Sequence, residues 1–179
     1  EPLSVSLDCQ RFSANINGTD PEEFPPIPTV DEGATIKVDP QLLKDTVTHV
    51  AFAAATEDSR PVLTGIKVEV NQSDFTFAAA DGFRLAVYEG KLLEPISEAM
   101  EFIIPAKALQ EVGRLIGTDD TAVEFTVTPA GTHALFNIGN VEIVSQLMPG
   151  SFPNFRSLIP AEYKNQVIVQ NSDFSRAVK

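Results

Sequence analysis

The stretches TIKVDPQLL (residues 35–43) and EFIIPAKAL (residues 101–109) follow one pattern, and this pattern decides the fold. In each stretch a short apolar run leads into a proline, and apolar residues then recur at helical spacing. Proline suits the first position of a helix, and Asp39 before Pro40 is a favourable N-cap. Leu43 of the first stretch aligns with Leu109 of the second. The sequence therefore predicts the same strand-to-helix unit twice.

The two helices are predicted over residues 40 to about 54 and residues 105 to about 116. Each has apolar residues on one side and polar residues on the other, as is typical of a helix that packs on a core. Gly117 follows the second helix and favours its termination. The apolar stripes consist of Leu43, Val47, Val50 and Ala54 in the first helix and Ala108, Leu109, Val112, Leu115 and Ile116 in the second.

Strand-like alternation of apolar and polar residues follows each helix. Turn-forming pairs such as Asp81-Gly82 and Gly139-Asn140 separate the alternating segments. The middle of the chain therefore predicts an α+β fold, with duplicated βαβββ units and antiparallel sheets. The segments with clear alternation are residues 3–7, 66–70, 75–79, 83–87, 123–127 and 134–138.

A longer repeat is marked by two Phe-Pro segments, EFPPIP at residues 23–28 and SFPNF at residues 151–155. The first precedes the strand predicted at residues 35–38. The second precedes a strand-like run at residues 166–169 and the start of a helix at residues 173–179. This order indicates the end of one repeat, one whole repeat and the start of another. A chance match of common dipeptides is the alternative.

The composition excludes several classes of protein. Lys plus Arg number 13 against 25 Asp plus Glu, and the net charge of −12 excludes a uniformly basic nucleic-acid binder, although not a locally basic face. Cys9 is the only cysteine, which excludes an internal disulfide framework and a multi-cysteine metal site. Because no apolar run could span a bilayer and no leader peptide is visible, we expect a cytoplasmic protein without a membrane partner.

Catalysis finds little support in the sequence. His49 is predicted on a helix and His133 in a strand, and both are interpreted as structural residues. Asp119-Asp120 follows a helix end and is interpreted as a turn, with a hydrolase that uses these two aspartates as the alternative. The sequence contains no glycine-rich phosphate-binding loop. We therefore expect no catalytic residue, no metal and no cofactor.

Four segments carry a resemblance to a known family: RPVLTG (residues 60–65), DGFRLA (residues 81–86), IPAK (residues 104–107), and FPNF (residues 152–155) with Ile159-Pro160. In this order they make the chain similar to the bacterial DNA sliding clamp, the beta subunit of the DNA polymerase III holoenzyme. The resemblance implies the DNA clamp fold, in which each of three domains has two βαβββ units and two helices on one face. Residues 1–30 would then end the first domain, residues 31–160 would form the complete middle domain, and residues 161–179 would begin the third.

The resemblance also implies a groove in which family members capture linear peptides of the replicative polymerase, the clamp loader and repair proteins. Apolar side chains would line its pockets, and Arg84 would present a planar donor at its rim. The groove wall carried over from the family consists of Leu63, Gly82, Phe83, Arg84, Leu85, Pro153, Ser157 and Leu158.

Double-stranded DNA is the second implied partner, bound without sequence preference inside a ring. The exposed faces of the two helices would meet the DNA, together with a loop residue after the first helix. Phosphate contacts carry no sequence information and therefore suit a protein that slides. The residues expected to face DNA are Lys44, Thr48, Arg60, Lys107, Gln110 and Arg114.

The function expected from the resemblance is that of a non-catalytic replication processivity factor, which forms a homodimeric ring at full length. The 179-residue chain is expected to be monomeric, because family rings join the first domain of one subunit to the third domain of another. A peptide-capture scaffold that does not act on DNA is the alternative, since it needs the groove but no basic inner face.

Overall fold

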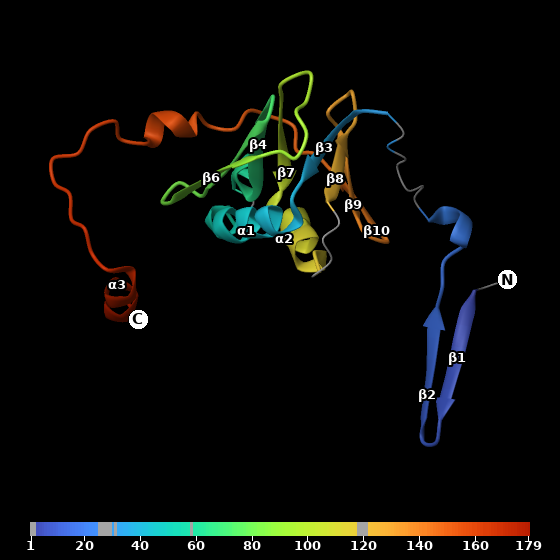
Figure 1. Ribbon diagram of the computed structural model, residues 1–179. Coiled ribbons are helices and arrows are strands. Elements are labelled where there is room, and N and C mark those ends of the chain that lie inside the picture. The colour runs from blue at the N-terminus through green and yellow to red at the C-terminus, as the bar shows by residue number, and fades with distance from the viewer. Residues whose placement is uncertain (1–2, 25–29, 31, 58, 118–121) are drawn as a thin grey trace.

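A computed structural model describes residues 3–24, 30, 32–57, 59–117 and 122–179 of the chain (Figure 1). The strands are β1 (Ser4–Cys9), β2 (Phe12–Asn17), β3 (Ala34–Val38), β4 (Gly65–Asn71), β5 (Asp74–Ala80), β6 (Leu85–Lys91), β7 (Met100–Pro105), β8 (Val123–Val127), β9 (His133–Ile138) and β10 (Val141–Gln146). The α-helices are α1 (Pro40–Val50), α2 (Ala106–Leu115) and α3 (Asn171–Ala177), and the 3-10 helices are η1 (Pro21–Glu23), η2 (Ala51–Ala53), η3 (Pro61–Thr64) and η4 (Phe155–Leu158).

The two predicted βαβββ units are interlocked rather than separate. One antiparallel sheet has the order β10-β9-β8-β3 and the other has the order β6-β5-β4-β7. The first strand of each unit thus completes the sheet of the other unit: Ile36 of β3 lies opposite Phe125 of β8, and Ile104 of β7 lies opposite Ile66 of β4. Neither unit can complete its sheet alone, so the two halves form one domain.

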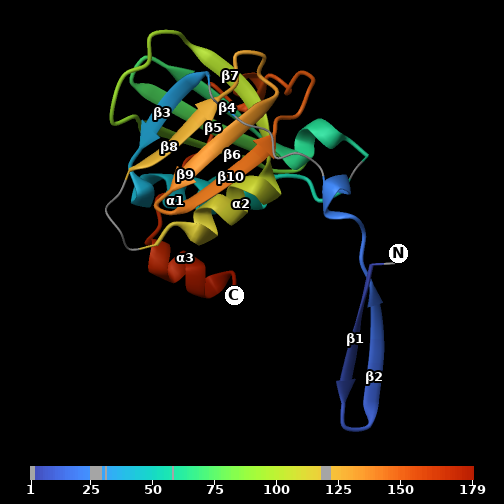
Figure 2. The same ribbon diagram turned by 90° about the vertical axis from the view of Figure 1, so that its right-hand side faces the viewer.

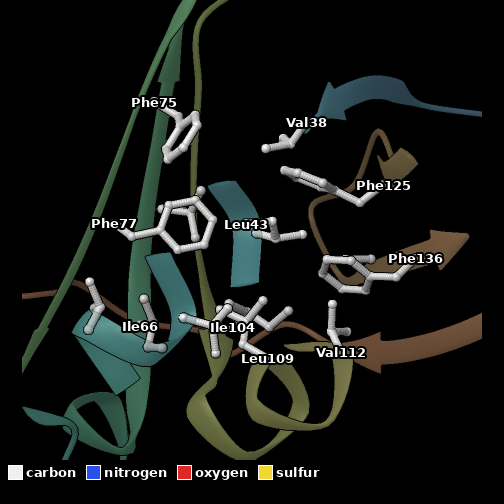
Figure 3. Close-up of a cluster of buried hydrophobic side chains, with 14 of the residues drawn as sticks. Val38, Leu43, Ile66, Phe75, Phe77, Ile104, Leu109, Val112, Phe125 and Phe136 are labelled. Carbon is white, nitrogen blue, oxygen red and sulfur yellow. The ribbon is translucent and has the colours of Figure 1, made fainter. Parts of the chain in front are cut away.

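The core lies between the two sheets and the helices that close one end of them (Figures 1 and 2). Figure 3 shows Phe75 and Phe77 of one sheet facing Phe125 and Phe136 of the other, with Leu109 of α2 below them. The rings of Phe125 and Phe136 stack with centroids 5.3 Å apart. All of these side chains are buried, which is the arrangement that the period-2 patterns predict.

The helices α1 and α2 lie side by side (Figure 2). The carboxylate of Asp39 accepts a hydrogen bond from the Leu42 amide and caps α1, as the sequence predicts. Where the helices cross, a Cβ atom added to Gly113 would lie 3.3 Å from Cγ1 of Val47. Glycine at this position therefore sets how closely the two helices approach.

Segments on either side of this domain extend away from it (Figures 1 and 2). The hairpin of β1 and β2 is fully antiparallel, and one of its faces bears exposed apolar side chains such as Val5, Leu7 and Ile16. The strand expected at residues 166–169 is wrong: these residues are extended and exposed, but no strand of the described chain pairs with them. An apolar run forms a stable strand only when a partner satisfies its backbone groups.

Candidate peptide-binding and DNA-facing surfaces

A pocket of about 420 Å³ lies where the end of α1 and η2 meets η3 and the β5–β6 turn. It brings together four of the predicted groove residues, which are distant in sequence. Arg60, expected to face DNA, also lines this pocket. The lining consists of Ala55, Thr56, Glu57, Ser59, Arg60, Leu63, Asp81, Gly82, Phe83 and Arg84.

The β5–β6 turn presents Phe83 and Arg84 in a defined geometry. The carboxylate of Asp81 accepts hydrogen bonds from the amides of Phe83 and Arg84, both at 3.0 Å, and from Nε of Arg84 at 2.8 Å. These donors lower the pKa of the Asp81 carboxyl, and the two backbone amides are the main cause. Gly82 has φ of +94°, a conformation that glycine adopts without strain. The turn leaves the Phe83 side chain fully exposed to solvent.

Leu63 forms the buried base of the pocket. It lies in η3, which begins after Arg60, and its amide donates to the Arg60 carbonyl at 2.9 Å. Its carbonyl in turn accepts from the Ala55 amide at 2.9 Å, which ties η3 to the segment after α1. Leu63 is 6% exposed, so its position is set by packing.

Phe52 is a residue of this surface that the sequence analysis missed. The guanidinium carbon of Arg84 lies 5.8 Å from the centroid of the Phe52 ring, within the range of a cation–π contact. Phe52 is exposed although it lies at the end of a helix whose other exposed residues are polar. A large aromatic residue off the apolar stripe was the available signal.

The remaining predicted groove residues lie apart from this pocket. Pro153 lines a second hollow of about 270 Å³ beside β4 and β7. Ser157 and Leu158 are exposed in η4, and the Ser157 hydroxyl donates to the Asn154 carbonyl at 2.7 Å. Leu85 is half-buried at the start of β6. The described residues therefore provide two separate parts of the predicted wall, not one continuous groove.

The residues expected to face DNA differ in how far their polar groups are exposed and free of partners within the protein. Thr48, Lys107 and Gln110 are exposed on α1 and α2. Lys44 is half-buried, and its ammonium donates to the Ile116 carbonyl at the end of α2. Arg114 is exposed, but its guanidinium pairs with Glu111 through a bond of 3.1 Å from Nε and a second from Nη2. Side-chain hydrogen bonding within this pair raises the pKa of Arg114 and lowers that of Glu111.

The histidines have structural surroundings. His49 stacks on Tyr88 with ring centroids 5.8 Å apart, and its Nδ1 lies 2.6 Å from the Asp45 carbonyl oxygen. His133 lies in β9 with its Nδ1 3.0 Å from the Thr132 hydroxyl. Asp119 and Asp120 lie outside the described residues. Among the residues that the structure describes, no group of three His, Cys, Asp or Glu could hold a metal ion.

Within the described ranges, every helix is too short or too polar to cross a membrane.

The fold matches that of a known family. The family model for the central domain of the DNA polymerase III beta subunit matches residues 37–154. The chain belongs to the DNA polymerase III beta subunit family. This finding confirms the resemblance inferred from the sequence and the α+β clamp fold that it implied.

Comparison with two sliding clamps shows what share of their length this chain spans. The beta sliding clamp of Bacillus subtilis (strain 168) is 34% identical over 164 residues, which is 92% of this chain and 43% of that protein. That of Staphylococcus aureus (strain Mu50) is 32% identical over 178 residues, which is 99% of this chain and 46% of that protein. The crystal structure of the Bacillus subtilis DNA polymerase sliding clamp superposes with a TM-score of 0.84 and 32% identity, over 98% of this chain and 46% of that one. The chain thus spans slightly less than half the length of these relatives.

Proposed function

We propose that the protein is a replication processivity factor of the cytoplasm that encircles double-stranded DNA and tethers the replicative polymerase, the clamp loader and repair proteins. Membership of the DNA polymerase III beta subunit family is the observation that carries this proposal. The family is named for a beta subunit of a polymerase, which supports an accessory role without catalysis. No cofactor is required.

The proposed domain division follows the structure of the repeat. Residues 1–30 supply the last strands of a first clamp domain, residues 31–160 form the middle domain, and residues 161–179 begin a third. The exposed apolar face of the β1–β2 hairpin supports this division, because such a face is stable when other strands or helices of its own domain cover it. A full-length protein of this kind closes as a homodimeric ring, and the 179-residue chain is a monomer.

The proposed DNA surface is the exposed side of α1 and α2. The adjacent helices support this assignment, since together they offer Thr48, Lys107 and Gln110 to solvent. Lys44 and Arg114 act less strongly, because their charges are already engaged within the protein. We expect weak, sequence-independent attraction to phosphates, so retention on DNA depends on ring closure.

The proposed partner surface is the wall formed by Leu63, Gly82, Phe83, Arg84, Leu85, Pro153, Ser157 and Leu158. A buried aliphatic base and an exposed ring suit apolar side chains of a linear peptide. The guanidinium of Arg84 suits a carboxylate or carbonyl of the same peptide.

Retention on circular DNA tests the proposal. A full-length clamp that contains this chain, once loaded on nicked circular DNA, is expected to remain bound in high salt and to be released when the DNA is made linear. Equal release from both forms would contradict encircling. It would favour a peptide-capture scaffold that does not act on DNA, which shares the partner surface.

A further inference from the structure

The loop that carries Pro153, Ser157 and Leu158 of the proposed wall is joined to the sheet by an ion pair. Arg156 of η4 lies 2.7 Å from Glu69 of β4, measured between Nη1 and Oε2. Pro153 precedes this arginine and Leu158 follows it, and both side chains belong to the proposed wall. The ion pair therefore acts at the centre of the segment whose position decides where these two side chains lie.

Glu69 is a carboxylate that needs a cation in this fold. In the β4–β7 ladder it lies directly opposite Glu101, and like charges directly opposite each other destabilise a sheet. Lys67, whose side chain is 12% exposed, pairs with Glu101 at 2.9 Å. Arg156 supplies the second cation, so two carboxylates and two cations form a balanced cluster. Without Arg156, Glu69 would have no ion-pair partner among the described residues and would still lie opposite Glu101.

The loop also has packing and hydrogen bonds of its own. Phe155 is 3% exposed, and the guanidinium carbon of Arg156 lies 4.6 Å from the centroid of its ring. The hydroxyl of Ser157 and the amide of Ser157 both donate to the Asn154 carbonyl. Because Arg156 lies within this packed turn, we expect a change at Arg156 to shift Pro153 and Leu158 as well.

We propose that Glu69 and Arg156 form a latch that positions Pro153 and Leu158 for the partner peptide, and that both are positioning residues of this site. The inference rests on the proposed peptide-binding function. The Glu69–Arg156 pair thus differs from an ordinary surface ion pair. It joins the wall to β4, and it balances the charge of Glu69, which lies opposite Glu101.

The latch itself is tested by hydrogen exchange, without any ligand. The amides of Ser157 and Ile159 donate to the carbonyls of Asn154 and Arg156, and they report opening of η4. Glu69→Gln and Arg156→Gln are each expected to speed their exchange roughly fivefold. The reciprocal variant E69R/R156E is expected to restore slow exchange. Glu142→Gln, a matched change on the exposed strand β10, is expected to leave it unchanged.

The positioning role is tested by binding of a fluorescein-labelled hexapeptide that contains leucine, phenylalanine and one glutamate. Glu69→Gln and Arg156→Gln are expected to weaken binding roughly fivefold, and E69R/R156E to restore it. Leu158→Ala, which removes a wall side chain directly, separates this inference from the proposed function.

Unchanged exchange in both single variants overturns the latch. Faster exchange with unchanged peptide affinity, while Leu158→Ala weakens binding, overturns the positioning role alone. If Leu158→Ala and Phe83→Ala both leave binding unchanged, the proposed wall is wrong and the positioning role falls with it, whereas the exchange result still decides whether the latch exists.

Discussion

The ammonium of Lys44 in α1 donates a hydrogen bond to the backbone carbonyl of Ile116, with 3.2 Å between nitrogen and oxygen. Ile116 is the C-cap of α2, where unpaired carbonyls carry the negative end of the helix dipole. One lysine of the proposed DNA face thus caps the neighbouring helix. Lys107, on the same face, is exposed, and no salt bridge involving it is found among the described residues.

These two lysines are expected to respond differently to substitution. Lys44→Ala should lower the free energy of unfolding by about 1 kcal/mol, because a charged hydrogen bond at a helix end is lost. Lys107→Ala should change it by less than about 0.5 kcal/mol. Urea denaturation of both variants measures the difference. Equal stability of the two variants would contradict the capping role of Lys44.

For DNA binding we expect the opposite: substitution of Lys107 has a larger effect than substitution of Lys44. Lys107→Ala should weaken binding of a short duplex and reduce the slope of log affinity against log salt by about 1, as expected for one lost phosphate contact. Lys44→Ala should reduce this slope by less. Fluorescence anisotropy at several salt concentrations measures the slope, and an unchanged slope for Lys107→Ala would argue against the proposed DNA face.

The turn at Asp81 is expected to depend on pH. Because hydrogen bonds from the amides of Phe83 and Arg84 lower the folded-state pKa of this carboxyl, its stabilising effect is complete well above the unfolded pKa of about 3.9. The effect is lost as the pH falls through the lower folded pKa. Asp81→Asn should therefore be less stable than the parent at neutral pH and equally stable in strong acid. Denaturation curves at several pH values measure this convergence, and a constant difference would contradict it.

The exposed wall residues are expected to contribute to peptide binding without affecting folding. Phe83 is fully exposed and Leu158 is 61% exposed, so Phe83→Ala and Leu158→Ala remove no core packing. Each should weaken binding of the labelled hexapeptide roughly tenfold, as anchor residues of an interface do. Leu93→Ala, at a similarly exposed leucine outside the wall, is the matched control. Unchanged binding in both Phe83→Ala and Leu158→Ala, or equal weakening by Leu93→Ala, would refute the assignment of the wall.

The crossing of α1 and α2 is expected to tolerate little extra volume. Gly113→Val would place atoms against Val47, where even a Cβ atom comes within 3.3 Å of Cγ1. We expect a loss of about 1–3 kcal/mol in the free energy of unfolding, as is usual when a packed interface is overfilled. Gly18→Val, where an added Cβ atom would have no neighbour closer than 3.6 Å, is the control in urea denaturation. A parent-like Gly113→Val would show that the helices can separate without cost.

Local features of the fold followed from local physics. The cap at Asp39, the proline at the start of α1 and the alternation of buried and half-buried side chains in β4 and β8 all depend on residues close in sequence. They were predictable for that reason. The helix predicted to about residue 54 is α-helical only as far as Val50. The next three residues form the 3-10 helix η2, and Ala54 is extended.

The composition of the candidate site was partly predictable and its arrangement was not. Motifs supplied Leu63, Gly82, Phe83 and Arg84, which the fold brings to one pocket. Arg60 was expected to face DNA, which stays a prediction, and the structure also places it in the lining of that pocket. Phe52 was missed because its contact with Arg84 joins residues from different elements.

The sequence alone was enough to predict the two longer helices, most strands of the middle domain, the duplication of the unit, and the family to which the chain belongs. Only the tertiary structure decided that β3 and β7 exchange sheets, that Lys44 caps the other helix and that Arg156 balances Glu69. The physical reason is the range of the interactions. Periodicity and capping act within a few residues, whereas strand order and ion pairing depend on which distant surfaces the whole chain can bury together.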